Sequence, residues 1–202
     1  CIQVDQERAI EELTEIAFDK GLPDNTAVSP TLHTEYRGLL GSLNWLQSRT
    51  QFQIAYRFSR CASAAAAPTI GDVKALNKLV RSVRASPVKL IFWPLKGQTR
   101  LVGYPDAAYR NNSDNSSQRG QCVFLAEARG SNPSAKGTLV DYESQKIRRT
   151  TLSTTVAELY SFMKCFGTCQ FVRGVWMDLS GQAAEIHMRT DAYNVVTTAF
   201  TT

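Results

Sequence analysis

The sequence predicts an α/β protein in which a helical first part precedes a mixed unit of strands and helix. Apolar residues recur at helical spacing from Thr34 to Ser86, and the composition becomes strand-like after Pro94. The order expected there is three strands, one long helix and a further strand. A chain of 202 residues is long enough for one or two compact units.

The composition is that of a globular protein, with 43% hydrophobic and 20% charged residues. The longest apolar runs, 61–68 and 89–95, are far shorter than the roughly 20 residues of a membrane span, so no span is expected. There is no initiator Met and no signal-peptide pattern, which favours a fragment of a longer protein. The net charge of +5 only slightly favours an anionic partner.

The five cysteines form an odd, scattered set, which favours free thiols in a reducing compartment, the cytoplasm or the nucleus. Cys165 and Cys169 lie one helical turn apart. For this pair we favour packing in the core over a shared metal ion, because the chain has only two histidines.

In the first part, residues 5–20 are expected to form an acidic helix that Gly21 ends, and residues 22–31 a linker. Pro68 breaks the helical stretch that follows, and Asp72 is expected as the N-cap or first-turn acid of the next helix. That helix has a basic face. Two interpretations of this face stay open, a solvated surface and a contact with a nucleic-acid backbone. Its residues are Lys74, Lys78, Arg81 and Arg84.

In the second part, strands are expected at 101–104, 121–128, 137–144 and 184–189, with a polar loop at 111–120. A long helix begins after Ser153 and ends at Gly181.

Three carboxylates fall where active sites form in such units. Asp106 and Asp191 are expected at strand ends, and Glu158 in the first turns of the long helix. Three converging acids would need a cation, for which Mg²⁺ is the natural choice. From the pattern alone, the ordinary role of an Asp after a strand, as a turn or cap residue, is the stronger alternative.

Four short motifs lie in the second part of the chain: residues 103–109 (Gly-Tyr-Pro-Asp-Ala-Ala-Tyr), 144–146 (Ser-Gln-Lys), 152–158 (Leu-Ser-Thr-Thr-Val-Ala-Glu) and 190–193 (Thr-Asp-Ala-Tyr). They are similar to segments of the ribonuclease H domain of copia-type LTR-retrotransposon Pol polyproteins. Upstream, residues 36–46 (Tyr-Arg-Gly-Leu-Leu-Gly-Ser-Leu-Asn-Trp-Leu) resemble the segment just after the reverse transcriptase. The resemblance covers essentially residues 5–200.

The resemblance implies a ribonuclease H-like mixed sheet with helices, preceded by a helical connection. It divides the chain into an acidic helix and linker at 1–30, a helical connection at 31–94, and a C-terminally incomplete ribonuclease H-like domain at 95–202. It also implies endonucleolytic hydrolysis of RNA in RNA–DNA hybrids with two Mg²⁺ or Mn²⁺ ions, held by Asp106, Glu158 and Asp191. Candidate phosphate contacts are Lys146, Arg148 and Arg149, for which a solvated strand edge is an equal alternative.

The sequence departs from the family's pattern in four ways. No carboxylate follows Asp191 where the family has its fourth, and the paired-Asp strand of the polymerase is missing, so no polymerase activity is expected. Val156 replaces a usual Glu, and Pro105, which lacks a ladder donor, precedes Asp106 and calls for a strand edge or a bulge. An alternative therefore stays open: a catalytically silent binding or scaffold subunit of a larger assembly, with the upstream reverse transcriptase as one candidate partner.

Overall fold

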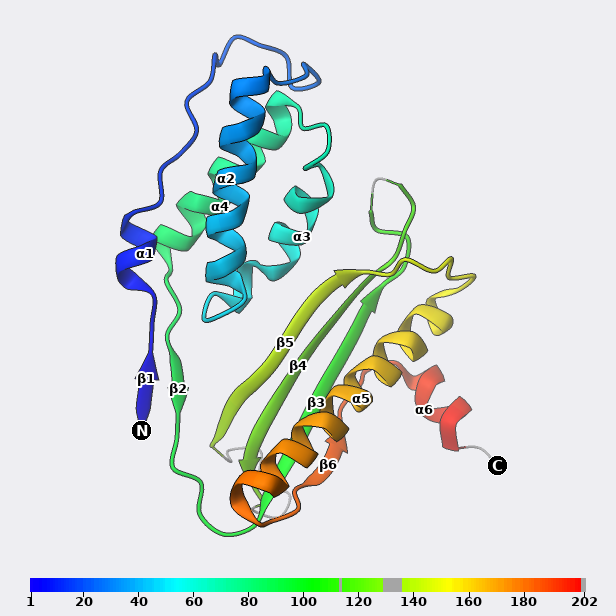
Figure 1. Ribbon diagram of the computed structural model, residues 1–202. Coiled ribbons are helices and arrows are strands. Elements are labelled where there is room, and N and C mark those ends of the chain that lie inside the picture. Colours follow the sequence, from blue (N-terminus) through cyan, green and yellow to red (C-terminus); the bar gives the residue numbers. More distant parts are fainter. Residues whose placement is uncertain (113, 129–135, 201–202) are drawn as a thin grey trace. The chain divides into compact units, whose positions relative to one another are not determined.

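The computed structural model describes residues 1–112, 114–128 and 136–200 (Figure 1). The chain forms two compact units. One comprises Val4–Leu90, and the other Cys1–Gln3 together with Ile91–Thr202. The division falls within a two-stranded ribbon of β1 (Ile2–Val4) and β2 (Leu90–Phe92).

The first unit is helical. It contains α1 (Glu7–Glu11), α2 (Pro30–Gln47), the 3-10 turn η1 (Phe52–Ile54), α3 (Ala55–Ser63) and α4 (Ile70–Ala85). Local capping explains where the two longest helices begin. The Ser29 hydroxyl caps α2 ahead of Pro30, and Thr69 forms a capping box with Asp72, the expected first-turn acid of α4.

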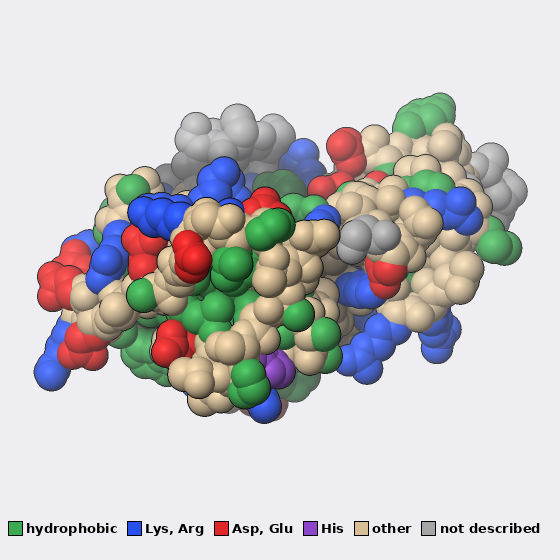
Figure 2. All heavy atoms as spheres, turned by 90° about the horizontal axis from the view of Figure 1, so that it is seen from above, with side chains coloured by type: hydrophobic (Ala, Val, Ile, Leu, Met, Phe, Trp, Pro, Cys, Tyr) green, Lys and Arg blue, Asp and Glu red, His purple; other side chains and the backbone are tan. Residues whose placement is uncertain are grey.

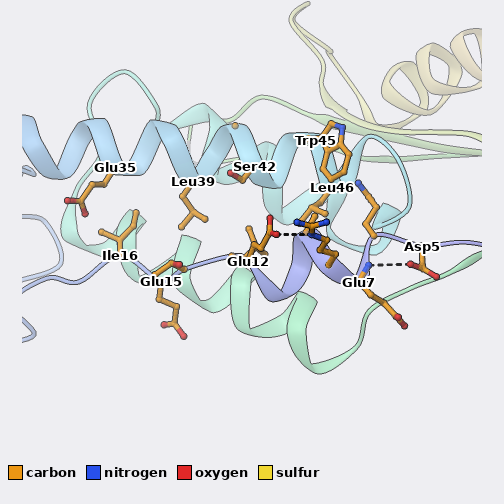
Figure 3. A pocket seen from close by; sticks show the side chains of 16 residues that line it. Asp5, Glu7, Glu12, Glu15, Ile16, Glu35, Leu39, Ser42, Trp45 and Leu46 are labelled. Atoms are coloured by element: carbon orange, nitrogen blue, oxygen red, sulfur yellow. Dashed lines mark hydrogen bonds and ion pairs between the residues drawn. The ribbon is translucent and has the colours of Figure 1, made fainter.

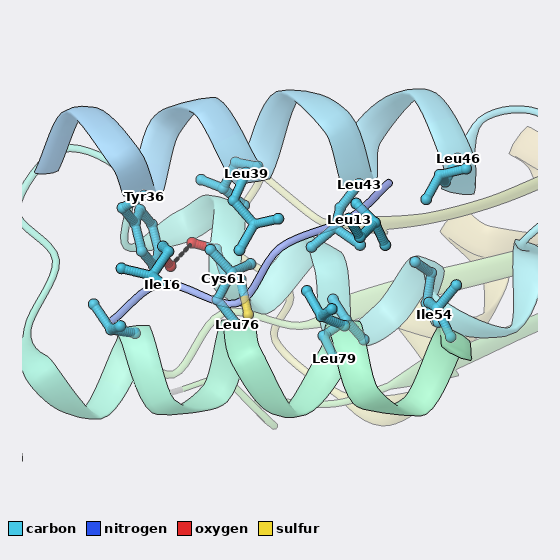
Figure 4. Packing of buried hydrophobic residues seen from close by; sticks show 14 of the residues in the cluster. Leu13, Ile16, Tyr36, Leu39, Leu43, Leu46, Ile54, Cys61, Leu76 and Leu79 are labelled. Carbon is cyan, nitrogen blue, oxygen red and sulfur yellow. Dashed lines mark hydrogen bonds between the residues drawn. The ribbon is translucent and has the colours of Figure 1, made fainter. Parts of the chain in front are cut away.

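One apolar core holds the helical unit together (Figure 4). The apolar residues of α2 recur at helical spacing, as expected for this stretch, and they pack against the apolar side of α4. Inside this core the Tyr36 hydroxyl donates a hydrogen bond of 2.8 Å to the Cys61 carbonyl oxygen, so its polar end is satisfied. Fully buried members are Tyr36, Leu43, Leu46, Ile54, Val73, Leu76, Leu79, Val80 and Val83.

The prediction of a helix over residues 5–20 is wrong beyond its first turn. Only Glu7–Glu11 is helical, and the chain then runs without regular structure past Ile16. The buried Asn77 side chain explains this, because it accepts a hydrogen bond from the Ile16 N–H at 2.9 Å and donates one to the Ile16 carbonyl at 2.8 Å. A side chain on α4 thus replaces the helical partners of this backbone.

The second unit is a mixed α/β structure. Its four-stranded sheet has the order β5-β4-β3-β6, with β3 antiparallel to β4 and parallel to β6. The strands are β3 (Thr99–Ala108), β4 (Gln118–Glu127), β5 (Gly137–Lys146) and β6 (Glu185–Met188). The helix α5 (Thr154–Ser180) crosses one face of the sheet (Figure 1).

The ends of α5 are those expected from its capping residues. The Ser153 hydroxyl accepts a hydrogen bond from the Val156 N–H at 3.2 Å, and Gly181 closes the helix with φ +70°. The strands also lie where expected, with β5 beginning at the expected Gly137 and the other boundaries shifted by one to four residues. The helix α6 (Tyr193–Phe200) was not expected.

The close approach of α5 to β3 depends on Gly103. A Cβ at this position would lie 2.9 Å from each of three sulfur atoms, those of Cys165, Cys169 and Met188. Both cysteines are fully buried, so they pack in the core as expected. All five cysteines are free thiols.

Pro105 is accommodated at a partial strand edge. Pairing of β3 with β6 ends at Gly103, two residues earlier, while pairing with β4 continues through Pro105 opposite Gln121 without a register shift. The missing N–H therefore removes no bond to β6.

Within the described ranges, no helix has the length and apolar character needed to cross a membrane.

Candidate active site

The three predicted carboxylates lie on three separate elements of the mixed unit. Asp106 is near the C-terminal end of β3, Glu158 is in the second turn of α5, and Asp191 follows β6. Asp106 and Asp191 are exposed, whereas Glu158 is half-buried.

The register between β3 and β6 brings the two aspartates to the same edge of the sheet. Gly103 pairs with Met188 in this parallel pair, and the Arg189 N–H donates to the Gly103 carbonyl at 2.8 Å. Asp106 and Asp191 each lie three residues beyond that last pair. Because carboxyl ends of parallel strands meet at one edge, both side chains belong to the same end of the unit.

Glu158 is fixed from two directions. The Ala107 N–H, next to Asp106 on β3, hydrogen-bonds the Glu158 carboxylate. One turn further along α5, the buried Ser161 hydroxyl donates to the carbonyl oxygens of Asp106 at 2.8 Å and Gly120 at 3.1 Å. These contacts attach the start of the helix to the strands that carry the site.

The charges of the three carboxylates act on one another. Burial, followed by the negative charges of Asp106 and Asp191, raises the pKa of Glu158 to about 7. The hydrogen bond from Ala107 opposes this rise. Glu158 is therefore partly protonated near neutral pH, and a cation placed among the three groups would favour its ionised form.

The donor set fits a hard divalent cation in its chemistry, because carboxylate oxygens are the ligands that Mg²⁺ takes. Among the residues that the structure describes, however, no group of three or more His, Cys, Asp or Glu side chains is arranged to hold a metal ion. The charges of Asp106 and Asp191 act on Glu158, but the three carboxylates are not arranged as a complete set of metal ligands.

The predicted phosphate contacts differ among themselves. Lys146 ends the edge strand β5 and forms an ion pair with Asp114, which holds the pKa of that carboxyl well below its usual range. Arg148 and Arg149 are exposed in the loop before α5. The charge of Lys146 is therefore partly neutralised within the unit, whereas both arginines face solvent.

The basic face of α4 contacts residues 11–24, which precede α2 and include several acids. Lys74 pairs with Asp24 at 2.6 Å, and Arg81 pairs with Glu15. Arg84 donates to main-chain carbonyl oxygens of the same segment. On the face shown in Figure 2, acidic and basic side chains are interspersed. These contacts favour a solvated, internally paired surface over a nucleic-acid contact.

Sequence patterns did not single out Ser161 as part of the site. Its only signal is position, because it follows Glu158 by three residues and so shares its side of the helix. Its role depends on the strand carbonyls that it meets, which no local pattern encodes.

The fold and the site together define a mixed α/β protein with three interacting carboxylates at one end of its sheet. Two polyproteins of Arabidopsis thaliana are similar to the chain. "Retrovirus-related Pol polyprotein from transposon RE1" is 28% identical over 147 residues, or 72% of this chain. "Retrovirus-related Pol polyprotein from transposon RE2" is 27% identical over 169 residues, or 79% of this chain.

The resemblance to copia-type retrotransposon Pol polyproteins, which the motifs predict, is thereby confirmed. The chain spans only about a tenth of the length of these relatives, 9% and 11% respectively. No family model matches the sequence, and no solved structure is significantly similar to it.

Proposed function

We propose that the second unit is a ribonuclease H-like domain, which hydrolyses the RNA strand of RNA–DNA hybrids with Mg²⁺ or Mn²⁺. The observation that carries the proposal is the pairing of Gly103 with Met188, which leads Asp106 and Asp191 to one sheet edge beside Glu158. The mixed sheet with α5 across one face is compatible with such a fold.

In this proposal, Asp106, Glu158 and Asp191 would hold the metal. Two divalent ions, when bound, would supply the activation of a water molecule and the stabilisation of the leaving oxygen of the phosphodiester. The residues of the chain fix the geometry, since Ser161 and the Ala107 N–H attach the start of α5 to β3. Ionisation of Glu158 completes the ligand set, and its raised pKa makes this step sensitive to pH.

The hybrid would approach the end of the sheet where these acids lie. Arg148 and Arg149 precede α5 and are exposed, so they are the better candidates for phosphate contacts, whereas Lys146 already neutralises Asp114. The similarity to Pol polyproteins suggests an upstream reverse transcriptase or a larger assembly as a protein partner.

A second candidate function is a binding or scaffold subunit without catalysis. It is favoured by one observation, that no described group of side chains is arranged to hold a metal ion. The two candidates differ in a single measurable property, metal-dependent turnover.

The test is cleavage of an RNA–DNA hybrid labelled on the RNA strand, with Mg²⁺ or Mn²⁺, by the full chain and by Asp106→Asn. The matched control is Asp178→Asn, which removes an exposed carboxylate near the other end of α5. We expect cleavage by the wild type and the control, and none by Asp106→Asn. Equal cleavage by Asp106→Asn, or none by folded wild type, would reject the enzymatic proposal, and the second result would favour the scaffold.

A further inference from the structure

The helical unit contains a long groove with no role in the proposed hydrolysis. It runs between α2 and the N-terminal segment, residues 5–16, and has a volume of about 1150 Å³ (Figure 3). This exceeds the roughly 300–1,000 Å³ of a typical small-molecule site. Its size and elongated form suit a stretch of polypeptide.

The floor of the groove is apolar. Leu13 and Ile16 come from the N-terminal segment, and Leu39 and Leu46 from α2, and all four are buried in the core below. Near the C-terminal end of α2, Trp45 is 51% exposed, so its aromatic face is open to a ligand. An indole face attracts Lys and Arg side chains.

The walls of the groove are acidic. Its lining includes five carboxylates and one basic side chain, Arg8, although the whole chain carries a net charge of +5. Figure 3 shows the acids spread along its length, from Glu35 at one end to Glu7 and Asp5 at the other. The acids are Asp5, Glu7, Glu12, Glu15 and Glu35.

Ion pairs leave an excess of negative charge in the groove. Arg8 pairs with Glu12. Two cations outside the lining also contribute, because Arg81 pairs with Glu15 and Lys89 pairs with both Glu7 and Asp5. These three cations face five carboxylates, and the pairs are substantially exposed, so each stabilises little.

A second, independent observation concerns Gln6, which also lines the groove and is only 8% exposed. Its Oε1 accepts hydrogen bonds from the Thr50 N–H at 3.1 Å and the Thr50 hydroxyl at 2.7 Å. Within the described part of the chain, its Nε2 has no hydrogen-bond partner. Because this nitrogen is itself shielded from solvent, a main-chain carbonyl of a ligand would reach it only after the Gln6 side chain turned toward the groove.

We propose that this groove binds a basic, amphipathic segment of a partner protein. Lys and Arg side chains of the segment would face the carboxylates, one of them over Trp45, and a carbonyl group would reach Gln6. The excess of carboxylates would repel a nucleic-acid backbone, so the groove and the proposed hybrid site would recognise ligands of opposite charge. The proposal does not depend on hydrolysis.

The test uses three fluorescein-labelled helical peptides of 18 residues and the full chain, with binding followed by fluorescence anisotropy. One peptide has Leu and Lys at amphipathic spacing, one has Glu in place of Lys, and one has Gln in place of Lys. We expect only the Leu/Lys peptide to bind, with an affinity that falls as salt is added.

Glu11 and Glu12 provide a matched pair of variants, since both are exposed acids at neighbouring positions but only Glu12 lines the groove. Glu12→Lys should weaken binding of the Leu/Lys peptide by roughly tenfold, and Glu11→Lys by less than about twofold. Trp45→Ala should weaken it by roughly threefold through loss of the cation–aromatic contact. If Glu12→Lys fails to fold, Glu35→Lys at the other end of the groove takes its place.

Three results would overturn the proposal. Equal losses in Glu11→Lys and Glu12→Lys would indicate diffuse attraction to an acidic surface. Binding of the Gln or Glu peptide as tightly as the Leu/Lys peptide would indicate that apolar contacts alone determine binding. Absence of binding by the Leu/Lys peptide at low salt would mean that the groove takes no basic segment.

Discussion

The Ser161 hydroxyl donates a hydrogen bond of 2.8 Å to the main-chain carbonyl oxygen of Asp106. It also approaches the Gly120 carbonyl at 3.1 Å, so one side chain of α5 contacts two neighbouring strands. Ser161 is 1% exposed and lies one turn after Glu158. The helical and strand contributions to the site are therefore joined by a buried polar contact.

Replacing Ser161 by Ala should lower the free energy of unfolding by about 1–3 kcal/mol, because the two carbonyl oxygens that share the buried hydroxyl proton lose this donor. Urea titration followed by circular dichroism measures this. The control is Ser42→Ala, whose hydroxyl makes only an exposed bond of 3.4 Å within its own helix, and for which the change should be close to zero. Equal effects of the two substitutions would contradict the structural role of Ser161.

Glu158 should make stability depend on pH between about 4.5 and 7. Its pKa is raised to about 7 in the folded protein, from an ordinary value of 4.5. In this window the folded state holds the proton more tightly than the unfolded state, so stability falls as pH rises. Above the window the destabilisation is complete, and below it the effect is absent.

The measurement is the melting temperature of wild type and Glu158→Gln at pH 4, pH 5.5 and pH 8, without divalent metal. The amide keeps an oxygen for the Ala107 N–H but does not ionise. The melting temperature of the variant relative to wild type should therefore rise from pH 4 to pH 8. Parallel melting curves across this range would contradict the raised pKa.

Added Mg²⁺ should stabilise wild type more at pH 8 than at pH 5.5, if the proposed metal site is correct.

Local signals determine much of the mixed unit, which is why its elements were predictable. Ser153 and Gly181 define the ends of α5 through a hydroxyl cap and a left-handed closing residue, and both act within one turn. The alternating strands also carry their pattern in the local sequence. The proximity of Asp106 and Asp191 has no such local signal, because it depends on the pairing of β6 with β3 across more than 80 residues.

Non-local contacts also explain why the helix predicted over residues 5–20 does not form beyond Glu11. Leu13 and Ile16 lie at spacings that suit a helix, and both are buried as a helical face would be. Burial of a side chain at every third position, however, does not require helical hydrogen bonds. Asn77, 61 residues away, provides the hydrogen-bond partners for Ile16. No pattern within residues 5–20 predicts this contact.

Asn77→Ala should therefore detach this segment. The substitution leaves the buried N–H and C=O of Ile16 without their partner, at a cost of about 1–3 kcal/mol for each unpaired group. Limited proteolysis should cut near Lys20 sooner than in wild type, and the melting temperature should fall. Lys78→Ala, at the exposed neighbouring position, is the control and should change neither. Unchanged proteolysis in Asn77→Ala would mean that apolar burial alone holds the segment.

The two exposed arginines before α5 should differ from Lys146 in their effect on hybrid binding. Arg148→Gln and Arg149→Gln should each lower the slope of log affinity against log salt by about one, if each contacts a phosphate. Lys146→Gln should have a smaller effect, because Asp114 already neutralises that charge. Binding of the labelled hybrid in Ca²⁺, over a series of salt concentrations, measures these slopes. A larger change for Lys146→Gln than for either arginine would reverse the assignment.

Gly103 should be intolerant of even one added methyl group. Its Cα faces the sulfur atoms of Cys165, Cys169 and Met188, each of which would lie 2.9 Å from an added Cβ. Two of these sulfurs belong to α5 and one to β6, so relief requires these side chains or the helix itself to move away from β3. Overpacking of this kind costs about 1–3 kcal/mol, so Gly103→Ala should be destabilised by that amount in urea titration. The control is Gly174→Ala on α5, where an added Cβ meets nothing within 4 Å and the helix should gain about 0.5–1 kcal/mol. The two Gly→Ala substitutions are thus expected to have opposite signs, and a neutral Gly103→Ala would mean that α5 can shift freely over the strand that carries Asp106.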